Sequence, residues 1–283
     1  LAVISNNMSL LLDAIIVVVK QDRSLQHASV CLENMHLFCQ CLRPIFPKEE
    51  VQAKAVRCIL TCSASESFVL QFIEKRLLAQ LCVGLEISDE VAEVTMDIFD
   101  EMIRHTSRFI RNLWASGGLI SLLKILASTN EPMPVREKAA SLVMLCVAKQ
   151  EGDELSKTLF NKLLASHFED MLDSPPSKIV QYFDQDHEGE DHPWGNHQRA
   201  ELRKFLYETS KKLRDTAFEP WSGGYRITDS QLQELRDAMY PPKPEGPSAN
   251  EGTSSATEVP APDVAAAEES TEAPAVDSEE NSS

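Results

Sequence analysis

A chain of 283 residues is long enough to form one or two domains and to bury a substantial hydrophobic core. Aromatic residues make up only 6% of the sequence and glycines number 10, a composition that favours helices over a β-sandwich. The net charge of −17 excludes a typical nucleic-acid-binding surface, because phosphate binding requires clustered positive charge.

The acidic charge is concentrated towards one end of the sequence. From Pro241 onward there are ten acidic residues and a single basic one, Lys243, and this segment contains no aromatic residue. Such a composition cannot bury enough apolar surface to offset the entropy cost of ordering. We therefore predict a disordered acidic tail over residues 241–283.

Seven cysteines, an odd number, fall mainly at apolar helical positions. This usage is typical of a reducing compartment, where free cysteine acts as a small buried hydrophobe, so we expect a cytoplasmic protein. The longest apolar run, residues 10–19, is interrupted by Asp13 and is shorter than the ~20 residues of a membrane-spanning helix. The first residue is Leu1, and we expect the sequence to be part of a longer protein.

Apolar spacing predicts helices through the first part of the chain. Two are expected at residues 9–20 and 28–41, the second ended by Pro44 and Pro47. Further on, the spacing i, i+4, i+7, i+8, i+11, which is typical of one buried helical face, occurs three times. The three sets are Val51, Ala55, Cys58, Ile59 and Cys62; Val91, Thr95, Ile98, Phe99 and Met102; and Val135, Ala139, Leu142, Val143 and Cys146.

These three sets recur at a nearly constant interval. Val51 and Val91 are 40 residues apart, and Val91 and Val135 are 44 residues apart. Both intervals lie within the period of about 40–47 residues found in armadillo and HEAT repeats. Second helices are expected between the sets, at residues 68–85 and 119–126.

Gly117 and Gly118 precede the second of these helices and suit a tight helix-to-helix turn; a simple glycine turn ahead of any helix is the alternative. No stretch alternates polar and apolar residues for long enough to form a sheet. The predicted fold is therefore all-α, with residues 1–172 forming an armadillo/HEAT-like α-solenoid of roughly three to four repeats.

Residues 173–240 predict a different arrangement, because the repeat spacing is lost there. A short helix is expected at residues 178–183, and a charged helix at about residues 197–218. A last helix is expected to begin near residue 229. The expected buried residues are Leu202, Phe205, Leu206 and Leu213 in the charged helix and Leu232, Leu235 and Met239 in the last one, which Thr228 or Asp229 would cap.

The sequence offers no set of residues for catalysis or metal binding. Residues 184–189 imitate the start of a calcium loop, but its position 12 is Gly195, where a bidentate glutamate is needed. His187, His192 and His197 have no cysteine nearby, so a solvated acidic loop is favoured over a zinc site. No nucleophile elbow, Walker loop or dinucleotide fingerprint occurs. We therefore expect a non-enzymatic protein with no catalytic residue, metal or cofactor.

The charged helix carries the main concentration of basic residues. Acidic residues are interspersed at helical spacing, a pattern typical of a solvated, salt-bridged face; contact with acidic lipid headgroups is the alternative. The basic residues are Arg199, Arg203, Lys204, Lys211, Lys212 and Arg214, and the acidic ones are Glu201, Glu208 and Asp215.

Residues 173–206, DSPPSKIVQYFDQDHEGEDHPWGNHQRAELRKFL, combine a short helix, an acidic turn, Trp194 beside Asn196 and a charged helix. This segment resembles the tryptophan-asparagine repeat of the endosomal J-domain proteins of the receptor-mediated-endocytosis family, large DnaJ homologues of the subfamily C type. In that family the Trp and Asn are adjacent, whereas Gly195 separates them here. The resemblance covers most of residues 115–206, including GGLISLLKILASTNEPMPVREKAASLVMLCVAKQ, which is similar to the late armadillo-like region of the family.

The resemblance implies a C-terminal fragment of such a protein that lacks the J domain. The His192-Pro193 pair is followed by Trp194 instead of the aspartate that a J domain requires, and the family's further helical repeats are replaced after about Phe218. It further implies a non-enzymatic scaffold acting in endocytosis, peripheral on the early endosome membrane. The family recruits Hsc70 through its J domain, and the implied partners are sorting-nexin, retromer-associated or clathrin-coat proteins.

Trp194 and Asn196 are the candidate protein-interaction residues, because exposed aromatic side chains anchor interfaces. The alternative is that Trp194 packs on the end of the helical repeats and Asn196 caps the helix that follows.

Two other functions stay open: an armadillo-type Hsp70 cochaperone acting as a nucleotide-exchange factor, and a generic armadillo adaptor. The endosomal interpretation predicts a His-Pro-Asp domain and further Trp-Asn repeats upstream in the parent gene. The exchange-factor interpretation predicts a complete short protein with neither.

Overall fold

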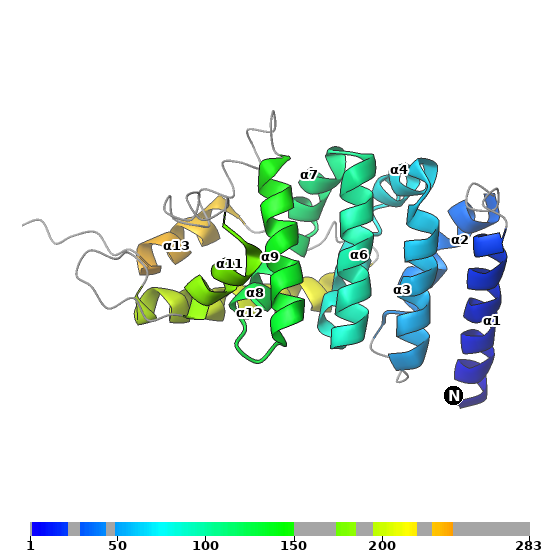
Figure 1. The fold of residues 1–283 in the computed structure, drawn as a ribbon, viewed down its shortest axis with the longest axis horizontal. Helices are drawn as coiled ribbons and strands as arrows, with labels where there is room; N and C mark the ends of the chain where they lie inside the picture. The colour runs from blue at the N-terminus through cyan, green and yellow to red at the C-terminus, as the bar shows by residue number, and fades with distance from the viewer. Residues whose placement is uncertain are drawn as a thin grey trace, which may run out of the picture. The chain divides into compact units, whose positions relative to one another are not determined.

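The computed structural model describes residues 2–21, 29–43, 49–149, 174–184, 195–219 and 228–239, which all belong to the unit Leu1–Pro242. The described residues form twelve α-helices and one short 3-10 segment, with no β-strand among them (Figure 1). The all-α class predicted from the sequence is confirmed. The predicted tail, residues 241–283, lies outside the described residues.

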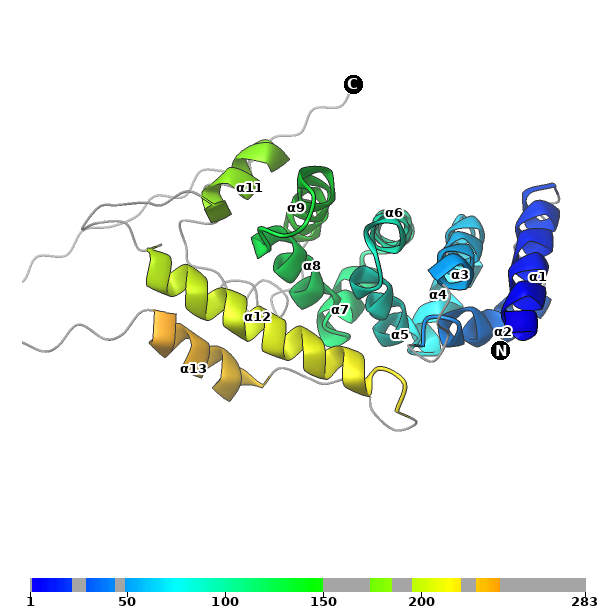
Figure 2. The ribbon, with the colours of Figure 1, turned by 90° about the horizontal axis from the view of Figure 1, so that it is seen from below.

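Four of the longer helices lie side by side in chain order. They are α1 (Ala2–Gln21), α3 (Glu49–Ser63), α6 (Asp89–His105) and α9 (Met133–Ala148), and each packs against the next (Figures 1 and 2). All fifteen residues of the three apolar sets are buried on α3, α6 and α9, as their spacing predicts. The recurring 40- and 44-residue intervals therefore correspond to successive helices of this row.

Shorter helices connect the members of the row. They are α2 (Ser29–Gln40), α4 (Glu66–Glu74), α5 (Leu78–Cys82), the 3-10 segment η2 (Val83–Glu86), α7 (Arg108–Ala115) and α8 (Gly118–Ala127). The sequence prediction omits α7, an eight-residue helix that buries Phe109, Ile110 and Leu113. Its three buried residues are too few to display a helical period on their own.

The single helix predicted over residues 68–85 is wrong. The chain turns after α4, where Arg76 adopts a left-handed backbone with φ of 56°. The Leu77 N–H donates to the Phe72 carbonyl, and the Arg76 N–H donates to the Ile73 carbonyl, which closes the helix end. Leu77 and Leu78 are buried on either side of the break, so the apolar pattern continues through the turn and conceals it.

The turn between α7 and α8 depends on glycine. Gly117 has φ of 80°, a left-handed conformation that residues with a Cβ rarely adopt. A Cβ at this position would also lie 2.3 Å from Cδ1 of Leu213 on another helix. The tight helix-to-helix turn predicted for the glycine pair is confirmed, and it allows a second helix to approach closely.

That second helix is α12 (Asn196–Thr216), which lies between α11 (Pro176–Asp184) and α13 (Asp229–Met239) in the chain. α12 packs against α8, α5 and α13 (Figure 2). Just beyond its end, the Phe218 carbonyl accepts a hydrogen bond of 3.3 Å from Nη2 of Arg43, which lies three residues after α2, and the Arg43 guanidinium stacks on the Phe218 ring. Of the seven core residues predicted on α12 and α13, six are buried and Phe205 is partly buried. Thr228 caps α13 by accepting a hydrogen bond from the Gln231 N–H.

The first helix differs from the sequence expectation. Among the described residues, Val3–Gln21 of α1 is long and apolar enough to cross a membrane, judged by length and composition alone. If each of two bent helix pairs is also counted as one span, the number of candidate spans in the described residues rises from one to three. The apolar run 10–19 is shorter than a membrane-spanning helix, as predicted from the sequence, but the helix that contains it extends beyond the run at both ends and passes the length and composition test as a whole.

Replacing Gly117 with alanine should destabilise the protein. A left-handed backbone costs a residue with a Cβ about 1–2 kcal/mol, and the contact with Leu213 adds to this. We expect Gly117→Ala to lower the free energy of unfolding in urea by about 2 kcal/mol or more. The control Glu93→Ala, an exposed change on α6, should change it by less than about 0.5 kcal/mol. Equal unfolding midpoints for the two variants would contradict this interpretation.

Candidate functional site

The C-terminal end of α8 is the point where four helices meet. Its last carbonyls have no partner inside the helix and attract positive charge. Arg136 of α9 donates from Nε and Nη2 to the Leu126 carbonyl, at 3.1 and 2.9 Å. Arg203 of α12 donates from Nε to the Ala127 carbonyl at 2.8 Å. Two arginines from different helices therefore cap α8.

The same arginines bind the end of α11. Arg136 forms a two-fold contact with the Asp184 carboxylate, with both nitrogen–oxygen distances at 2.8 Å, although Arg136 is only 4% exposed. Arg203 donates from Nη2 to the Phe183 carbonyl at 3.1 Å. Burial, followed by the charge of Arg199, lowers the pKa of Arg203. We call Arg136, Asp184 and Arg203 the arginine junction; it joins α8, α9, α11 and α12.

A second polar contact holds the far half of α12. The Glu86 side chain, at the end of η2, is 8% exposed and lies 3.3 Å from both Lys124 Nζ and Arg214 Nη1. Ser210 also donates a hydrogen bond to it. Because Glu86 faces two cations and a hydroxyl, its charge is compensated despite burial.

These contacts correct the prediction of a solvated basic face on the charged helix. Arg199 is buried, while Arg203 and Arg214 are partly exposed and bind groups on other helical segments. Lys204, Lys211 and Lys212 are exposed, as predicted. Sequence spacing could not distinguish the three arginines from the three lysines, because the alternation of charge is the same whether a basic residue pairs within its own helix or with another helix.

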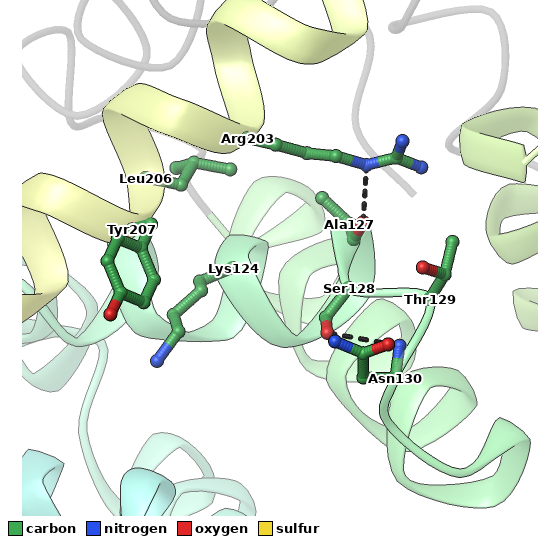
Figure 3. A pocket seen from close by; sticks show the side chains of 8 residues that line it. All are labelled: Lys124, Ala127, Ser128, Thr129, Asn130, Arg203, Leu206 and Tyr207. Atoms are coloured by element: carbon green, nitrogen blue, oxygen red, sulfur yellow. Dashed lines mark hydrogen bonds between the residues drawn. The ribbon is translucent and has the colours of Figure 1, made fainter.

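A pocket of about 200 Å³ lies beside the arginine junction, between the end of α8 and α12 (Figure 3). Lys124 lies on one wall with its Nζ 5.8 Å from the centre of the Tyr207 ring, and the Tyr207 side chain is largely exposed. The Asn130 N–H donates to Ser128 Oγ at the opposite side. The lining residues are Lys124, Ala127, Ser128, Thr129, Asn130, Arg203, Leu206 and Tyr207.

The chemistry of this lining suits binding. Two cations, an exposed aromatic ring and short polar side chains line the pocket, and no lining residue is an acid, a histidine or a cysteine. Such a wall matches a carboxylate next to an apolar or aromatic group on a partner.

The residues predicted for interaction lie elsewhere or outside the described part. Trp194 lies outside the described residues, so its prediction stays untested. Asn196 is exposed and is the first residue of α12, where its Oδ1 accepts a hydrogen bond from Arg199. The cap position is Gly195, whose N–H donates to Gln198 Oε1 at 3.1 Å, so the alternative role of Asn196 as the cap is wrong. Asn196 is not among the residues that line the pocket.

Lys124 and Tyr207 were missed by sequence reasoning. Arg203 and Tyr207 are four residues apart and share a face of α12, which is a detectable signal for a polar and aromatic surface. Lys124 is the one charged residue of α8, a helix made mostly of apolar residues. Nothing in the sequence indicates that these two helices face each other.

The cysteines behave as the sequence predicts. Six of the seven cysteines are free and buried: Cys39, Cys41, Cys58, Cys62, Cys82 and Cys146. Burial raises the pKa of the Cys82 and Cys146 thiols to about 12, so both stay protonated near neutral pH. In the described part of the chain, no three His, Cys, Asp or Glu side chains are grouped to hold a metal ion. Of the three histidines considered for zinc, His187 and His192 lie outside that part.

No family model matches this chain, and no curated protein or solved structure is significantly similar to it.

Removing Arg203 should loosen the pocket wall. The variant Arg203→Ala deletes charge-assisted hydrogen bonds to two backbone carbonyls, each worth roughly 1.5–3 kcal/mol when buried. Because Arg203 is partly exposed, we expect a loss of about 2 kcal/mol in the free energy of unfolding in urea. The neighbouring exposed Lys204→Ala is the control and should change it by under about 0.5 kcal/mol. A control that is as unstable as Arg203→Ala would refute the capping role.

Glu131, next to the pocket residue Asn130, should make stability depend on pH. Burial, followed by the charge of Asp89, raises the pKa of Glu131 above 4.5. The folded state therefore holds this proton more tightly, and stability falls as the pH rises from 4.5 through the folded-state pKa. Glu131→Gln should be more stable than wild type near neutral pH and should match it below the unfolded-state pKa. Urea unfolding across this range checks this, with Glu93→Gln as an exposed control; parallel curves for wild type and Glu131→Gln would contradict it.

Proposed function

We propose that this chain is a non-enzymatic helical scaffold of an endosomal DnaJ-like co-chaperone, built as an armadillo/HEAT-like α-solenoid with a tryptophan-asparagine-type module after it. Two observations support the solenoid. The apolar sets recur at 40- and 44-residue intervals, and the helices that carry them pack side by side as α3, α6 and α9. Stacked helices of this kind bury one continuous core between neighbours.

The arginine junction is the observation that carries this proposal. α11 and the start of α12 come from residues 173–206, the segment that resembles the tryptophan-asparagine repeat. Arg136 and Arg203 tie this segment to the ends of α8 and α9, which come from the part that resembles the late armadillo-like region. The two parts of the resemblance are thus joined by partly buried, charge-assisted contacts, as expected of one rigid scaffold.

The pocket beside the junction is the proposed partner site. Lys124, Arg203 and Tyr207 favour an acidic peptide segment that also carries an apolar side chain. By the family resemblance, the proposed partners are sorting-nexin, retromer-associated or clathrin-coat proteins on early endosomes. Their binding would take place in the cytoplasm, peripheral to the membrane.

Pull-downs from a cell extract test this function. The tagged chain should isolate sorting nexins or clathrin-coat proteins, and Tyr207→Ala should reduce their recovery at least several-fold, because Tyr207 is the exposed aromatic wall of the pocket. Lys211→Ala, an exposed change on the same helix, should leave recovery unchanged. Trp194→Ala, run in parallel, reports whether the sequence-predicted residue contributes separately.

Two results would overturn the proposal. The first is the absence of any endosomal coat protein from the wild-type pull-down. The second is acceleration of nucleotide release from purified Hsc70 by the chain, because this activity defines the alternative exchange factor.

A further inference from the structure

The loop between α8 and α9, residues 128–132, contributes three residues to the pocket and is the longest connection between helices within residues 49–149. Thr129 and Asn130 are exposed, and Ser128 is half-buried. The Ser128 hydroxyl accepts one long hydrogen bond of 3.4 Å, from the Asn130 N–H. Because the loop lies outside both helices, another enzyme can reach its hydroxyl groups without unwinding a helix.

Ser128 also has a carboxylate close by in the sequence, since Glu131 follows three residues later. Protein kinases select an acceptor by the charges around it, and the acidophilic class selects a serine or threonine with an acid three residues later. Three described residues have this pattern. Two of them lie within helices: Ser63 is buried on α3, and Thr216 of α12 donates its hydroxyl to the Lys212 carbonyl at 2.9 Å. Ser128 is the described acceptor that combines the acidic pattern with an accessible loop.

A phosphate on Ser128 would lie in a cationic pocket. Phosphoserine carries about −1.5 to −2 charges near neutral pH and has three strong acceptor oxygens. The charged residues that line this pocket are Lys124 and Arg203 (Figure 3). Ser128 directly follows the C-terminal end of α8, whose carbonyls repel an anion, so these two side chains would supply the stabilisation of the phosphate.

We propose that an acidophilic protein kinase phosphorylates Ser128 and that the phosphate then occupies the pocket, on Lys124 and Arg203. In this step the γ-phosphoryl group of ATP is transferred to Ser128 Oγ. The bond between the γ-phosphorus and the bridging oxygen breaks, a bond between phosphorus and Oγ forms, ADP leaves, and the hydroxyl proton passes to the base of the kinase. The phosphate uses the same two cations as an acidic partner, so phosphorylation switches the partner site off. This last consequence rests on the proposed function, whereas the modification itself does not.

Mapping of the phosphorylated residues tests the modification. The full chain is incubated with ATP and casein kinase 2, an acidophilic kinase, and its peptides are analysed by mass spectrometry. We expect phosphate on Ser128, added at least several-fold more slowly in Glu131→Gln. Ser141, an exposed serine of α9 without the acidic pattern, should stay unmodified, and Ser255, which has the pattern, is the positive control. A chain that is phosphorylated on Ser255 and not on Ser128 would overturn the proposal.

Phosphorus NMR tests where the phosphate binds. The signal that is missing from Ser128→Ala belongs to the Ser128 phosphate. The second pKa of a solvated phosphoserine is about 6, and contact with two cations should lower it. Lys124→Ala should raise this pKa back towards that value, whereas the exposed Lys211→Ala should leave it as in wild type. Equal values for wild type and Lys124→Ala, with circular dichroism showing both folded, would place the phosphate outside the pocket and overturn the second half of the proposal.

Partner recovery tests the switch. In the pull-down from cell extract, the phosphorylated chain and Ser128→Glu should both recover several-fold less of the coat proteins than unmodified wild type does. Ser141→Glu adds the same charge at an exposed position of α9 outside the pocket lining and should leave recovery unchanged. Full recovery by the phosphorylated chain would overturn the switch.

The two proposals fail separately. If unmodified wild type isolates no coat protein, the proposed function fails, and peptide mapping with phosphorus NMR still decides whether Ser128 is modified and where its phosphate lies. If coat proteins are recovered but Ser128 accepts no phosphate, only the modification fails.

Discussion

Arg136 imposes the constraint on which the C-terminal half of the described structure depends. A guanidinium that is 4% exposed has lost its hydration and must be paired and hydrogen-bonded, or the folded state becomes several kcal/mol less stable, on the order of the cost of an uncompensated buried charge. The Leu126 carbonyl and the Asp184 carboxylate supply those partners. Because one lies at the end of α8 and the other at the end of α11, satisfying Arg136 fixes the position of both helices.

The placement of α12 follows from this constraint. Arg203 can reach the Ala127 and Phe183 carbonyls only when α8 and α11 end side by side, which the contact between Arg136 and Asp184 ensures. Once Arg203 is in place, the helix runs across α8 towards α5 and η2, where the Glu86 carboxylate accepts a hydrogen bond from Ser210 and pairs with Arg214. Because Gly117 has no Cβ, the Leu213 side chain of α12 can pack directly against the backbone there. The pocket at Lys124 and Tyr207 is therefore a consequence of how α12 is anchored.

Apolar periodicity predicted the row of helices because burial on one face leaves a repeating mark in the sequence, as at Val91, Thr95 and Ile98. It could not predict the break at Arg76, since buried leucines continue the pattern through the turn. It also missed the pocket. Charge spacing on α12 is the same whether Arg203 faces solvent or the carbonyls of another helix, and only the three-dimensional position of α8 decides between them.

A double-mutant cycle on Arg136 and Asp184 tests the central claim most directly. Arg136→Met, Asp184→Asn and the double variant are compared with wild type by urea unfolding. The partly buried two-fold contact predicts a coupling free energy of about 2 kcal/mol, with the double variant much less destabilised than the sum of the single ones. Additive effects, within about 0.5 kcal/mol, would show that the two residues act independently and would contradict the account.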